Sequence, residues 1–408
     1  MKRRPNSVAP RGTALRSGEP EALEVLRNAY VDPVKVADSW RAAGGKVIGI
    51  LGHDAPRELV VALEMLPIRV APLRLTRTGE PPPSAAPKSL TNELSPDAGL
   101  ILAAMLEGRL DWMDGLVIGR DSEIYAKLFA VLRELARIGG LRNSPPIVFY
   151  DRILSTSNAA ARYNRLRIDE LANTLSSWAG RELTKDGIAD AVSETNSAVT
   201  TLRELAAARR AEVPMLRGSD VLSVAGAALT LPGDALTEAL AHLATGHDGP
   251  GTPSTPGRAR VFITGSPQDD LWTYQTLESA GFNIVGEDHD WGEGGWNLIK
   301  ETPDPVDGIL DRHRTIQPRA ARTGVRERCH NTARMAIEAR ADLVIQIIFC
   351  HDEASGWEFP FLRELLASTG IHVVQARVQY AHQDPTPLLQ AVRVIPSQEY
   401  TVEGKPHG

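Results

Sequence analysis

Two parts of this chain repeat the order strand, helix, strand, and that order most constrains the fold. In the first part, the apolar run KVIGIL (46–51) precedes a helix-forming stretch, RELVVALEML (57–66), which has Pro56 at its first turn. A second apolar run, IRVAPLRL (68–75), follows directly. Two strands joined by one helix over about 30 residues are expected to lie parallel in one sheet.

The same alternation continues to residue 150 and starts again near residue 258. Further strands are expected at 114–119, 145–150, 260–263, 283–290, 343–350 and 371–378, and further helices at 21–43, 100–108, 120–139, 269–281, 332–341 and 359–370. The pattern predicts an α/β protein with two doubly wound parallel sheets of Rossmann or flavodoxin-like type.

Between these parts, from 156 to 245, the strand signal disappears. Apolar residues follow one helical stripe instead, at Ile188, Val192, Val199, Leu202 and Ala206. The expected division is a disordered arm at 1–20, an α/β domain at 21–150, a helical segment at 151–246, a Gly- and Pro-rich linker at 247–257, a second α/β domain at 258–398 and a tail at 399–408.

Charge and cysteine content exclude several classes of protein. The formal net charge is −6, which argues against a general nucleic-acid binder, because phosphate binding needs a concentrated basic surface. The chain contains no run of about 18 apolar residues, so no membrane span is expected. The basic start of the chain is not followed by an apolar segment, so a secretory signal is not expected either. Two cysteines cannot build a disulfide framework, so a reducing cytoplasm is expected.

Ligands of open parallel sheets bind beyond the carboxyl ends of the strands, which directs attention to the loops there. In TGSPQDD, Gly265 and Ser266 precede a helix, where backbone N–H groups and the helix dipole favour a phosphate or carboxylate. The alternative is a tight turn in which Ser266 and Asp269 cap the helix.

The two cysteines give a second candidate. Cys350 ends a strand and could be a soft-metal ligand, a nucleophile with His351 as base, or a small buried side chain. Cys329 and His330 precede a helix whose following strand ends at Cys350, so they could approach it, although two cysteines are few for a cluster. The loop DWGEGGW (290–296) could surround an apolar or aromatic group, or be an ordinary ordered surface loop.

Several of these segments together resemble the 2-hydroxyacyl-CoA dehydratase / benzoyl-CoA reductase family, and in particular its 2-hydroxyglutaryl-CoA dehydratase D-component. The resemblance covers about residues 45 to 395 and rests on the order and spacing of its motifs. These are GHDAPRELVVALEMLPIRV, DGLVIGRDSEIYAKL, PPIVFYDRILSTSNAAARYNRLRIDEL, GRELTKDGIADAVSETNSAVTTLREL, RVFITGSPQDDLWTYQTLESAGFNIVGED and ADLVIQIIFCHDEASGWEFPFLRELLASTGIHVV.

The resemblance implies a cytoplasmic α/β protein that works with a related subunit on an acyl-CoA thioester. Members of the family hold a [4Fe–4S] cluster on three cysteines and receive one electron from an ATP-dependent activator protein. That electron makes a ketyl radical from the thioester, which leads to dehydration in the dehydratases, while the reductases deliver it to an aromatic thioester.

This chain departs from the family's cysteine pattern. The resemblance places the first two cluster cysteines at Gly52 and Arg120, and only Cys350 occupies a cluster position. Glycine has no ligand atom and arginine is a permanent cation, so a full cluster would need Cys329, His53 or His351 as substitutes. Arg120, near Gly52 and His53, could instead bind a carboxylate or coenzyme A phosphates, or simply pair with Asp121 or Glu123.

Three interpretations follow. The chain is a dehydratase- or reductase-type subunit with an unusual cluster on Cys350 and Cys329, or the cluster-free partner of a related, cluster-bearing subunit. In the third, it is an α/β protein that binds a small molecule or performs acid–base chemistry with His53, Asp54 and Arg120. The departure from the cysteine pattern favours the cluster-free partner.

Overall fold

A computed structural model describes residues 22–77, 80–84, 86–141, 143–212, 216–245, 257–315, 324–380 and 384–393. The predicted disordered arm at 1–20, the tail at 399–408 and nearly all of the predicted linker at 247–257 lie outside these residues. The chain forms two compact units, each assembled from separate stretches. Unit 1 comprises residues 1–202, 223–249 and 297–316, and unit 2 comprises residues 203–222, 250–296 and 317–408.

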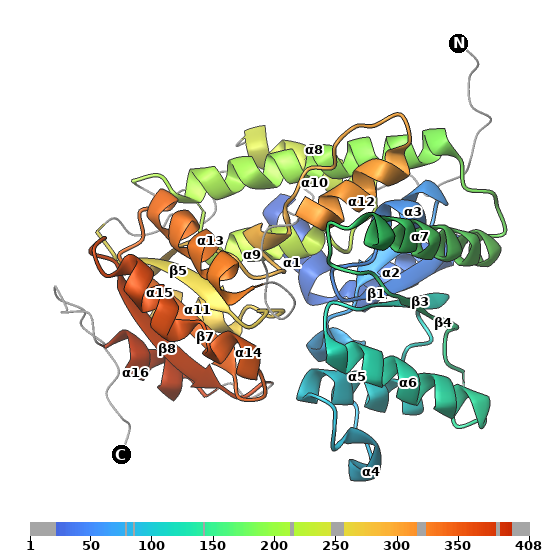
Figure 1. The fold of residues 1–408 in the computed structure, drawn as a ribbon, viewed down its shortest axis with the longest axis horizontal. Helices are drawn as coiled ribbons and strands as arrows, with labels where there is room; N and C mark the ends of the chain where they lie inside the picture. The colour runs from blue at the N-terminus through green and yellow to red at the C-terminus, as the bar shows by residue number, and fades with distance from the viewer. Residues whose placement is uncertain are drawn as a thin grey trace. The chain divides into compact units, whose positions relative to one another are not determined.

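Unit 1 contains a four-stranded parallel sheet. Its strands are β1 (Val47–Leu51), β2 (Leu66–Arg69), β3 (Gly115–Gly119) and β4 (Ile147–Tyr150). They lie in the order β2-β1-β3-β4, so the chain moves from β1 outward to β2 and then crosses back to β3. Figure 1 labels β1, β3 and β4 of this sheet. Every residue of β1 and β3 is buried, as expected of central strands that are covered on both faces.

Helices cover both faces of this sheet. On one face, Val47 and Leu51 pack with residues of α2 (Pro33–Ala42), α5 (Pro96–Leu106) and α6 (Glu123–Arg137). On the other, Ile48 and Ile50 pack with residues of α3 (Arg57–Ala62), α7 (Asn158–Ala179), α8 (Lys185–Arg209) and α12 (Pro305–Thr315). Alternate residues of β1 therefore serve opposite hydrophobic cores, which is the doubly wound arrangement that the sequence predicts.

Unit 2 repeats this topology. Its strands are β5 (Arg260–Gly265), β6 (Asn283–Glu287), β7 (Leu343–Phe349) and β8 (His372–Val378), in the order β6-β5-β7-β8 and all parallel. α13 (Val325–Glu338) and α15 (Phe359–Leu366) pack on one core with Phe262, Val285 and Val344. α11 (Trp272–Ser279) and α16 (Thr386–Val392) contact each other and the strands beside them.

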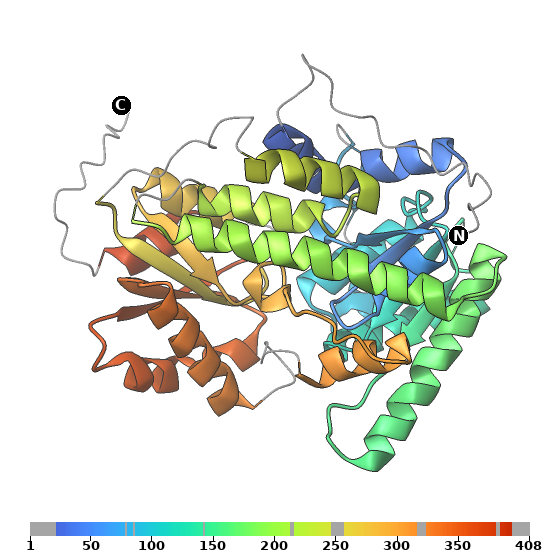
Figure 2. The same ribbon diagram turned by 90° about the horizontal axis from the view of Figure 1, so that it is seen from above.

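The remaining elements are mostly helical. They are α1 (Ala22–Val31), the 3-10 helices η1 (Pro72–Arg74) and η2 (Glu293–Gly295), α4 (Lys88–Thr91), α9 (Gly218–Ala227), α10 (Gly233–Thr245) and α14 (Glu353–Gly356). The stretch predicted to be a helical segment holds α7 to α10, and α8 is one unbroken helix of 25 residues (Figure 2). The five residues of its predicted apolar stripe are all buried.

Two predictions for the segment after β1 are wrong. The helix after β1 ends at Ala62, because Glu64 takes a left-handed conformation (φ 58°) that turns the chain into β2. β2 spans Leu66–Arg69 rather than 68–75, and Pro72 starts a 3-10 turn instead. Pro67 is tolerated inside β2 because β2 is an edge strand and the backbone nitrogen of residue 67 faces away from β1, where no ladder N–H is needed.

The helix predicted at 332–341 begins seven residues earlier, at Val325, with Gly324 as its N-cap. Cys329 and His330 therefore lie inside α13 and not in front of it. The spacing Val325, Cys329, Ala333 continues the buried stripe of this helix when cysteine is treated as an apolar residue.

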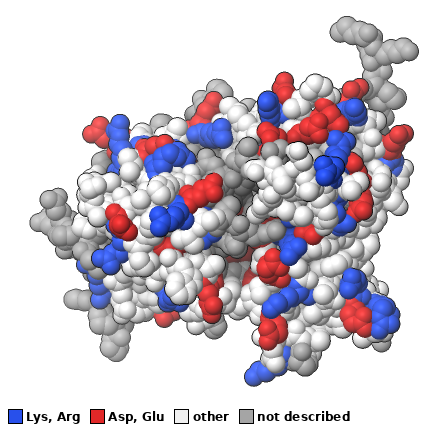
Figure 3. Space-filling view, viewed as in Figure 1, with Lys and Arg blue, Asp and Glu red and all other residues white. Residues whose placement is uncertain are grey.

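No helix within the described ranges is both long enough and apolar enough to cross a membrane. On the face seen in Figure 3, lysine and arginine side chains alternate with aspartate and glutamate, and neither sign of charge gathers into a continuous field. This mixture agrees with the modest net charge of −6.

Candidate functional site

Each sheet has a topological switch point at its carboxyl edge, where neighbouring connections leave in opposite directions. In unit 1 it lies between β1 and β3, and in unit 2 between β5 and β7. Crevices at such points are where open α/β sheets bind ligands. Gly52, His53 and Arg120 follow β1 and β3, whereas Gly265, Ser266 and Cys350 end or follow β5 and β7.

In unit 1, the loop after β1 is built around a carboxylate. Gly52 has φ 90°, and a Cβ placed on it would lie 2.4 Å from Asp121 Oδ1. The His53 backbone N–H donates to Asp121 Oδ2 (3.0 Å), and His53 Nδ1 lies 2.9 Å from the same oxygen. Glycine at position 52 thus allows Asp121 to approach the β1 loop and hold His53.

A second carboxylate reaches the other side of the His53 ring. Asp54 Oδ1 lies 3.3 Å from His53 Nε2 and accepts a hydrogen bond from Arg152 Nη2 (2.5 Å). Asp54 is fully buried and Arg152 is only 5% exposed, so this ion pair is shielded from solvent. The imidazole therefore lies between two carboxylates, an arrangement suited to holding and transferring a proton.

Arg120 is already paired with carboxylates. Its guanidinium contacts Asp151 Oδ1 (3.2 Å) and Glu123 Oε1 (3.2 Å). Hydrogen bonds to Glu123 and Asp151 raise the pKa of Arg120 above its ordinary value. Tyr163 also donates to Asp151 (2.8 Å). Of the two expected partners, Glu123 pairs with Arg120, while Asp121 turns to His53.

In unit 2, Gly265 and Ser266 form a tight turn against β7. Gly265 has φ 105°, and the Ser266 N–H donates to Ile347 O (2.8 Å). The Ser266 hydroxyl donates to Asp352 (2.7 Å) and accepts from the Phe349 N–H (3.0 Å). The N–H and hydroxyl of Ser266 are thus occupied within the protein, so an anion at this loop would have to be held by other groups.

The predicted helix capping at this loop does not occur. α11 begins only at Trp272, where Asp270 accepts from the backbone N–H (3.0 Å). Asp269 instead accepts a hydrogen bond from the Tyr380 hydroxyl (2.8 Å).

Cys350 is exposed, which rules out the small buried side chain considered from the sequence. It follows β7 directly, and its N–H donates to Val378 O (2.9 Å). The His351 ring stacks on Phe349, with 5.7 Å between centroids, and meets Tyr380 edge-on.

Cys329 is the opposite case. It is 1% exposed in the core between α13 and the sheet, and its Sγ lies 3.7 Å from Glu358 O. Burial raises the pKa of Cys329 to about 12, so the side chain is a neutral thiol at physiological pH. Metal ligation by cysteine requires the thiolate, which this environment disfavours. No group of three potential metal ligands among the described residues includes either cysteine.

A half-buried acid, Asp288, directly follows β6. Asp288 accepts hydrogen bonds from the hydroxyls of Thr332 on α13 and Thr264 on β5. Burial raises its pKa from the ordinary 3.8 to about 6. Asp288 is therefore an acid at a strand end that changes protonation near neutral pH, as a general acid or base must.

We expect Asp288 to make the protein less stable as pH rises. The folded state holds the Asp288 proton more tightly than the unfolded chain, so the free energy of unfolding should fall between about pH 4 and pH 6. The loss should be on the order of 2 to 3 kcal/mol for this group. Asp288→Asn should flatten that part of the profile in urea unfolding, and Glu364→Gln, at an exposed position, should not. An unchanged slope in Asp288→Asn would contradict the assignment.

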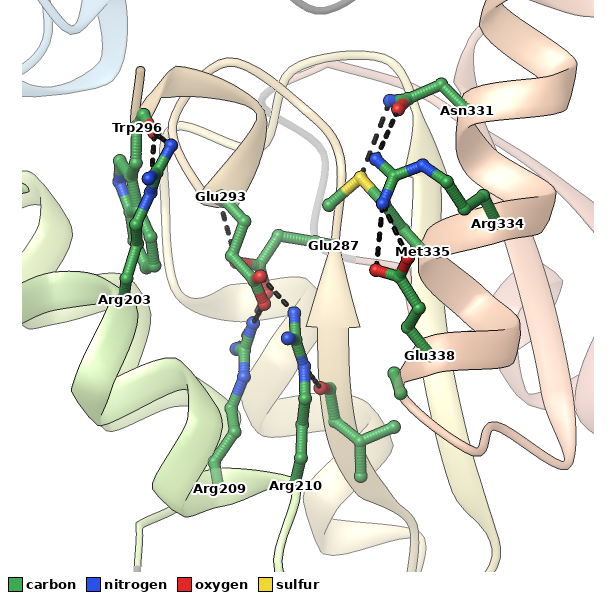
Figure 4. Close-up of polar contacts among 12 residues, drawn as sticks. Arg203, Arg209, Arg210, Glu287, Glu293, Trp296, Asn331, Arg334, Met335 and Glu338 are labelled. Atoms are coloured by element: carbon green, nitrogen blue, oxygen red, sulfur yellow. Dashed lines mark hydrogen bonds and ion pairs between the residues drawn. The ribbon is translucent and has the colours of Figure 1, made fainter. Parts of the chain in front are cut away.

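Beside Asp288, a charged network ties β6 to the end of α8 (Figure 4). Arg209 contacts Glu287 (2.7 Å) and Glu293 (2.5 Å), and Arg210 also pairs with Glu293. Arg209 and Glu287 are fully buried. Burial would favour their neutral forms, but the mutual attraction prevails and holds the pKa of Arg209 above, and that of Glu287 below, the ordinary values.

This network fixes the loop 290–296. Glu293 lies in η2, Trp296 O accepts from Arg203 (2.7 Å), and the indoles of Trp291 and Trp296 are buried. The loop is an ordered, partly buried connection and not the surface loop considered above. Glu287, Asp288 and His289 were missed as site residues, although three consecutive polar residues at a strand end are a signal in the sequence.

Similarity to known proteins identifies the family of this chain. The family "2-hydroxyglutaryl-CoA dehydratase, D-component" matches residues 53–393. A relative is "(R)-2-hydroxyglutaryl-CoA dehydratase, subunit beta" of Acidaminococcus fermentans, 23% identical over 222 residues. That alignment covers 54% of this chain and 56% of the relative, so the chain spans little more than half of that protein's length. The resemblance seen in the sequence is thereby confirmed, and the chain belongs to the 2-hydroxyglutaryl-CoA dehydratase D-component family.

Proposed function

We propose that this chain is a cluster-free subunit of a 2-hydroxyacyl-CoA dehydratase-type system, which binds an acyl-CoA thioester beside a related, cluster-bearing subunit. The family match over residues 53–393 supports the class of reaction. The name of the Acidaminococcus protein describes one subunit of an enzyme, which supports a partner subunit. The observation that carries the proposal is the polar network around His53, in the place where the resemblance expects cluster ligands.

The residues of this chain do not fit a [4Fe–4S] cluster. Such a cluster needs three or four thiolates, and the chain has two cysteines, one of which is a buried neutral thiol. Gly52 offers no ligand atom, and Arg120 is a cation paired with Glu123 and Asp151. In this proposal the one-electron ketyl chemistry and the ATP-dependent activator therefore belong with the related subunit.

What this chain contributes is binding and proton handling. His53, between Asp54 and Asp121, is the side chain that would take or give a proton at the carboxyl edge of the β1–β4 sheet. The Arg152–Asp54 pair fixes one flanking carboxylate, and Gly52 gives the other room. Arg120 would orient a thioester or a phosphate by exchanging one of its carboxylate partners for the ligand.

Two measurements test this proposal: the iron and sulfide content of the protein, and its stabilisation by acyl-CoA thioesters. Protein purified under strict anaerobiosis should be free of iron and sulfide and show no absorbance shoulder near ~400 nm. Acyl-CoA thioesters at 100 times their dissociation constant should raise the free energy of unfolding by about 2.7 kcal/mol, and the corresponding free acids should not.

Variants sharpen this test. His53→Gln should lower turnover by the reconstituted pair of subunits while acyl-CoA still stabilises the variant. His372→Gln, at an exposed position on β8, is the matched control. Stoichiometric iron and sulfide would overturn the cluster-free assignment. Stabilisation by free acids alone would favour a small-molecule binder that uses His53, Asp54 and Arg120 in other acid–base chemistry.

A further inference from the structure

Arg120, at the carboxyl edge of the β1–β4 sheet, holds two carboxylates in different ways. One is Asp151, whose Oδ1 and Oδ2 lie 3.2 and 3.4 Å from Arg120 Nη1. The other is Glu123, whose two carboxylate oxygens both lie 3.2 Å from Nη2. The Asp151 side chain is 17% exposed, whereas the Glu123 side chain is 64% exposed. Nη1 of the guanidinium therefore contacts a sheltered carboxylate, and Nη2 contacts one that lies mostly in solvent.

The sheltered carboxylate, Asp151, is fixed from two sides. Tyr163 on α7 donates its hydroxyl to Asp151 Oδ2 (2.8 Å), while Arg120 contacts Oδ1. Asp151 directly follows β4, and the Arg120 backbone N–H donates to Tyr150 O at the end of that strand (3.2 Å). Because the aspartate side chain is short, Asp151 cannot leave Arg120 without also losing the contact with Tyr163. We therefore expect Nη1 to keep Asp151 when a ligand binds.

Glu123 is held more weakly. It is the first residue of α6, and the start of this helix is fixed by Ser122, whose hydroxyl accepts from the Ile124 N–H (3.2 Å). Within the described part of the chain, Arg120 alone pairs with the Glu123 carboxylate. The side chain can rotate into solvent without any movement of the backbone, and it then regains rotamer freedom. Since an exposed ion pair contributes little free energy, Glu123 is the partner that a ligand can replace.

We propose that the Glu123 carboxylate occupies the place of a ligand oxyanion on Arg120 Nη2, and that a phosphate or carboxylate group of the bound thioester displaces it. The position of both Glu123 oxygens on Nη2 marks a side of Arg120 that accepts an oxyanion. Charge requires displacement, because a third anion beside Asp151, Glu123 and a single guanidinium would be repelled. Glu123 thus sets the affinity of this anion site. The acyl-CoA as ligand rests on the proposed function, whereas the displaceable contact does not.

Calorimetric titration with inorganic pyrophosphate at low salt tests the displacement. Glu123→Gln keeps the length of the side chain and removes its charge, so pyrophosphate should bind about twofold to fivefold more tightly, the range that corresponds to one exposed ion pair. Glu134→Gln is the matched control, because it removes the carboxylate of another exposed ion pair on α6, with Arg137, and it should leave the affinity unchanged. In an Arg120→Gln background, Glu123→Gln should give no gain, because the cation for which the two anions compete is missing.

Three thiol and thioester compounds then distinguish the source of the oxyanion. Succinyl-CoA and butyryl-CoA have acyl groups of equal length, with and without a terminal carboxylate. A gain in Glu123→Gln for both and for coenzyme A assigns the site to a phosphate, and a gain for succinyl-CoA alone assigns it to the acyl carboxylate. Binding of these compounds without a gain for any of them would overturn the displacement by a thioester.

The pyrophosphate arm separates this proposal from the proposed function. No pyrophosphate gain in Glu123→Gln, or a gain that persists without Arg120, would overturn the anion site even if acyl-CoA stabilises the wild-type protein. If acyl-CoA does not bind but the pyrophosphate gain depends on Arg120, the proposed function is wrong and the anion site of Arg120 and Glu123 stands.

Discussion

Arg209→Met is expected to destabilise unit 2 by about 3 to 5 kcal/mol, because it leaves buried Glu287 without its cation and removes one of the two cations that pair with Glu293. Glu287 is fully buried, and Glu293 keeps only the contact with Arg210. Methionine retains the length and helix propensity of the side chain in the last turn of α8, so the loss reports on charge and not on the helix. Equilibrium urea unfolding followed by circular dichroism measures it.

The exposed ion pair between Arg334 and Glu338, also drawn in Figure 4, provides the matched control for Arg209→Met. Arg334 pairs with Glu338 one turn along α13, and both side chains are about half exposed. Arg334→Met should cost less than about 1 kcal/mol, because solvent screens an exposed ion pair. Equal losses in the two variants would mean that the buried network around Arg209 contributes no more than a surface pair.

The second large effect is expected at the turn after β5. Gly265→Ala would bring its Cβ within 2.2 Å of the Ile347 carbonyl oxygen, at a backbone φ of 105°. The clash is with backbone of a central strand, which cannot move aside without breaking the Ser266 N–H bond to Ile347 O. A loss on the order of 3 kcal/mol or more is expected in the same unfolding experiment.

Gly370→Ala separates the clash from the backbone conformation. Gly370 also has a positive φ (81°), but an added Cβ there meets no atom within 4 Å. Its substitution should cost only the conformational penalty of about 1 to 2 kcal/mol. If Gly265→Ala were as mild as Gly370→Ala, the turn would have to relax away from β7.

The architecture was readable from the sequence because central parallel strands are largely apolar on both faces. KVIGIL and LVIQIIF each form a nearly continuous apolar run, interrupted in the second only by Gln346, and each is followed by a stretch with a helical pattern. The bounds of β2 were predicted wrongly because β2 contains Pro67 and lies at a sheet edge. The β-propensity of individual residues is a weak guide to where an edge strand begins and ends. The start of α13 was missed because Cys329 was treated as a reactive residue and not as an apolar one.

The candidate site was less predictable, since its polar contacts join residues far apart in the sequence. Position 52 is informative only once Asp121 is seen to fill the space beside it. Arg120 gives no sign in the sequence that Asp151 is its partner. The pairing of Arg209 with Glu287 joins a helix end to a buried strand, and periodicity does not predict it.

The assembly of unit 1 from three stretches of chain has a consequence for protein synthesis. Arg312 on α12 forms the ion pair with fully buried Glu58, and the two residues are 254 positions apart. At about 5 to 20 residues per second, the ribosome adds the arginine roughly 13 to 50 s after the glutamate. During that interval Glu58 is present in the emerging chain without the Arg312 guanidinium that pairs with it in the folded protein. We expect a chaperone of nascent chains to bind this incomplete form of unit 1. A fragment of residues 1–202 expressed alone would lack Arg312 and would remain in that incomplete form.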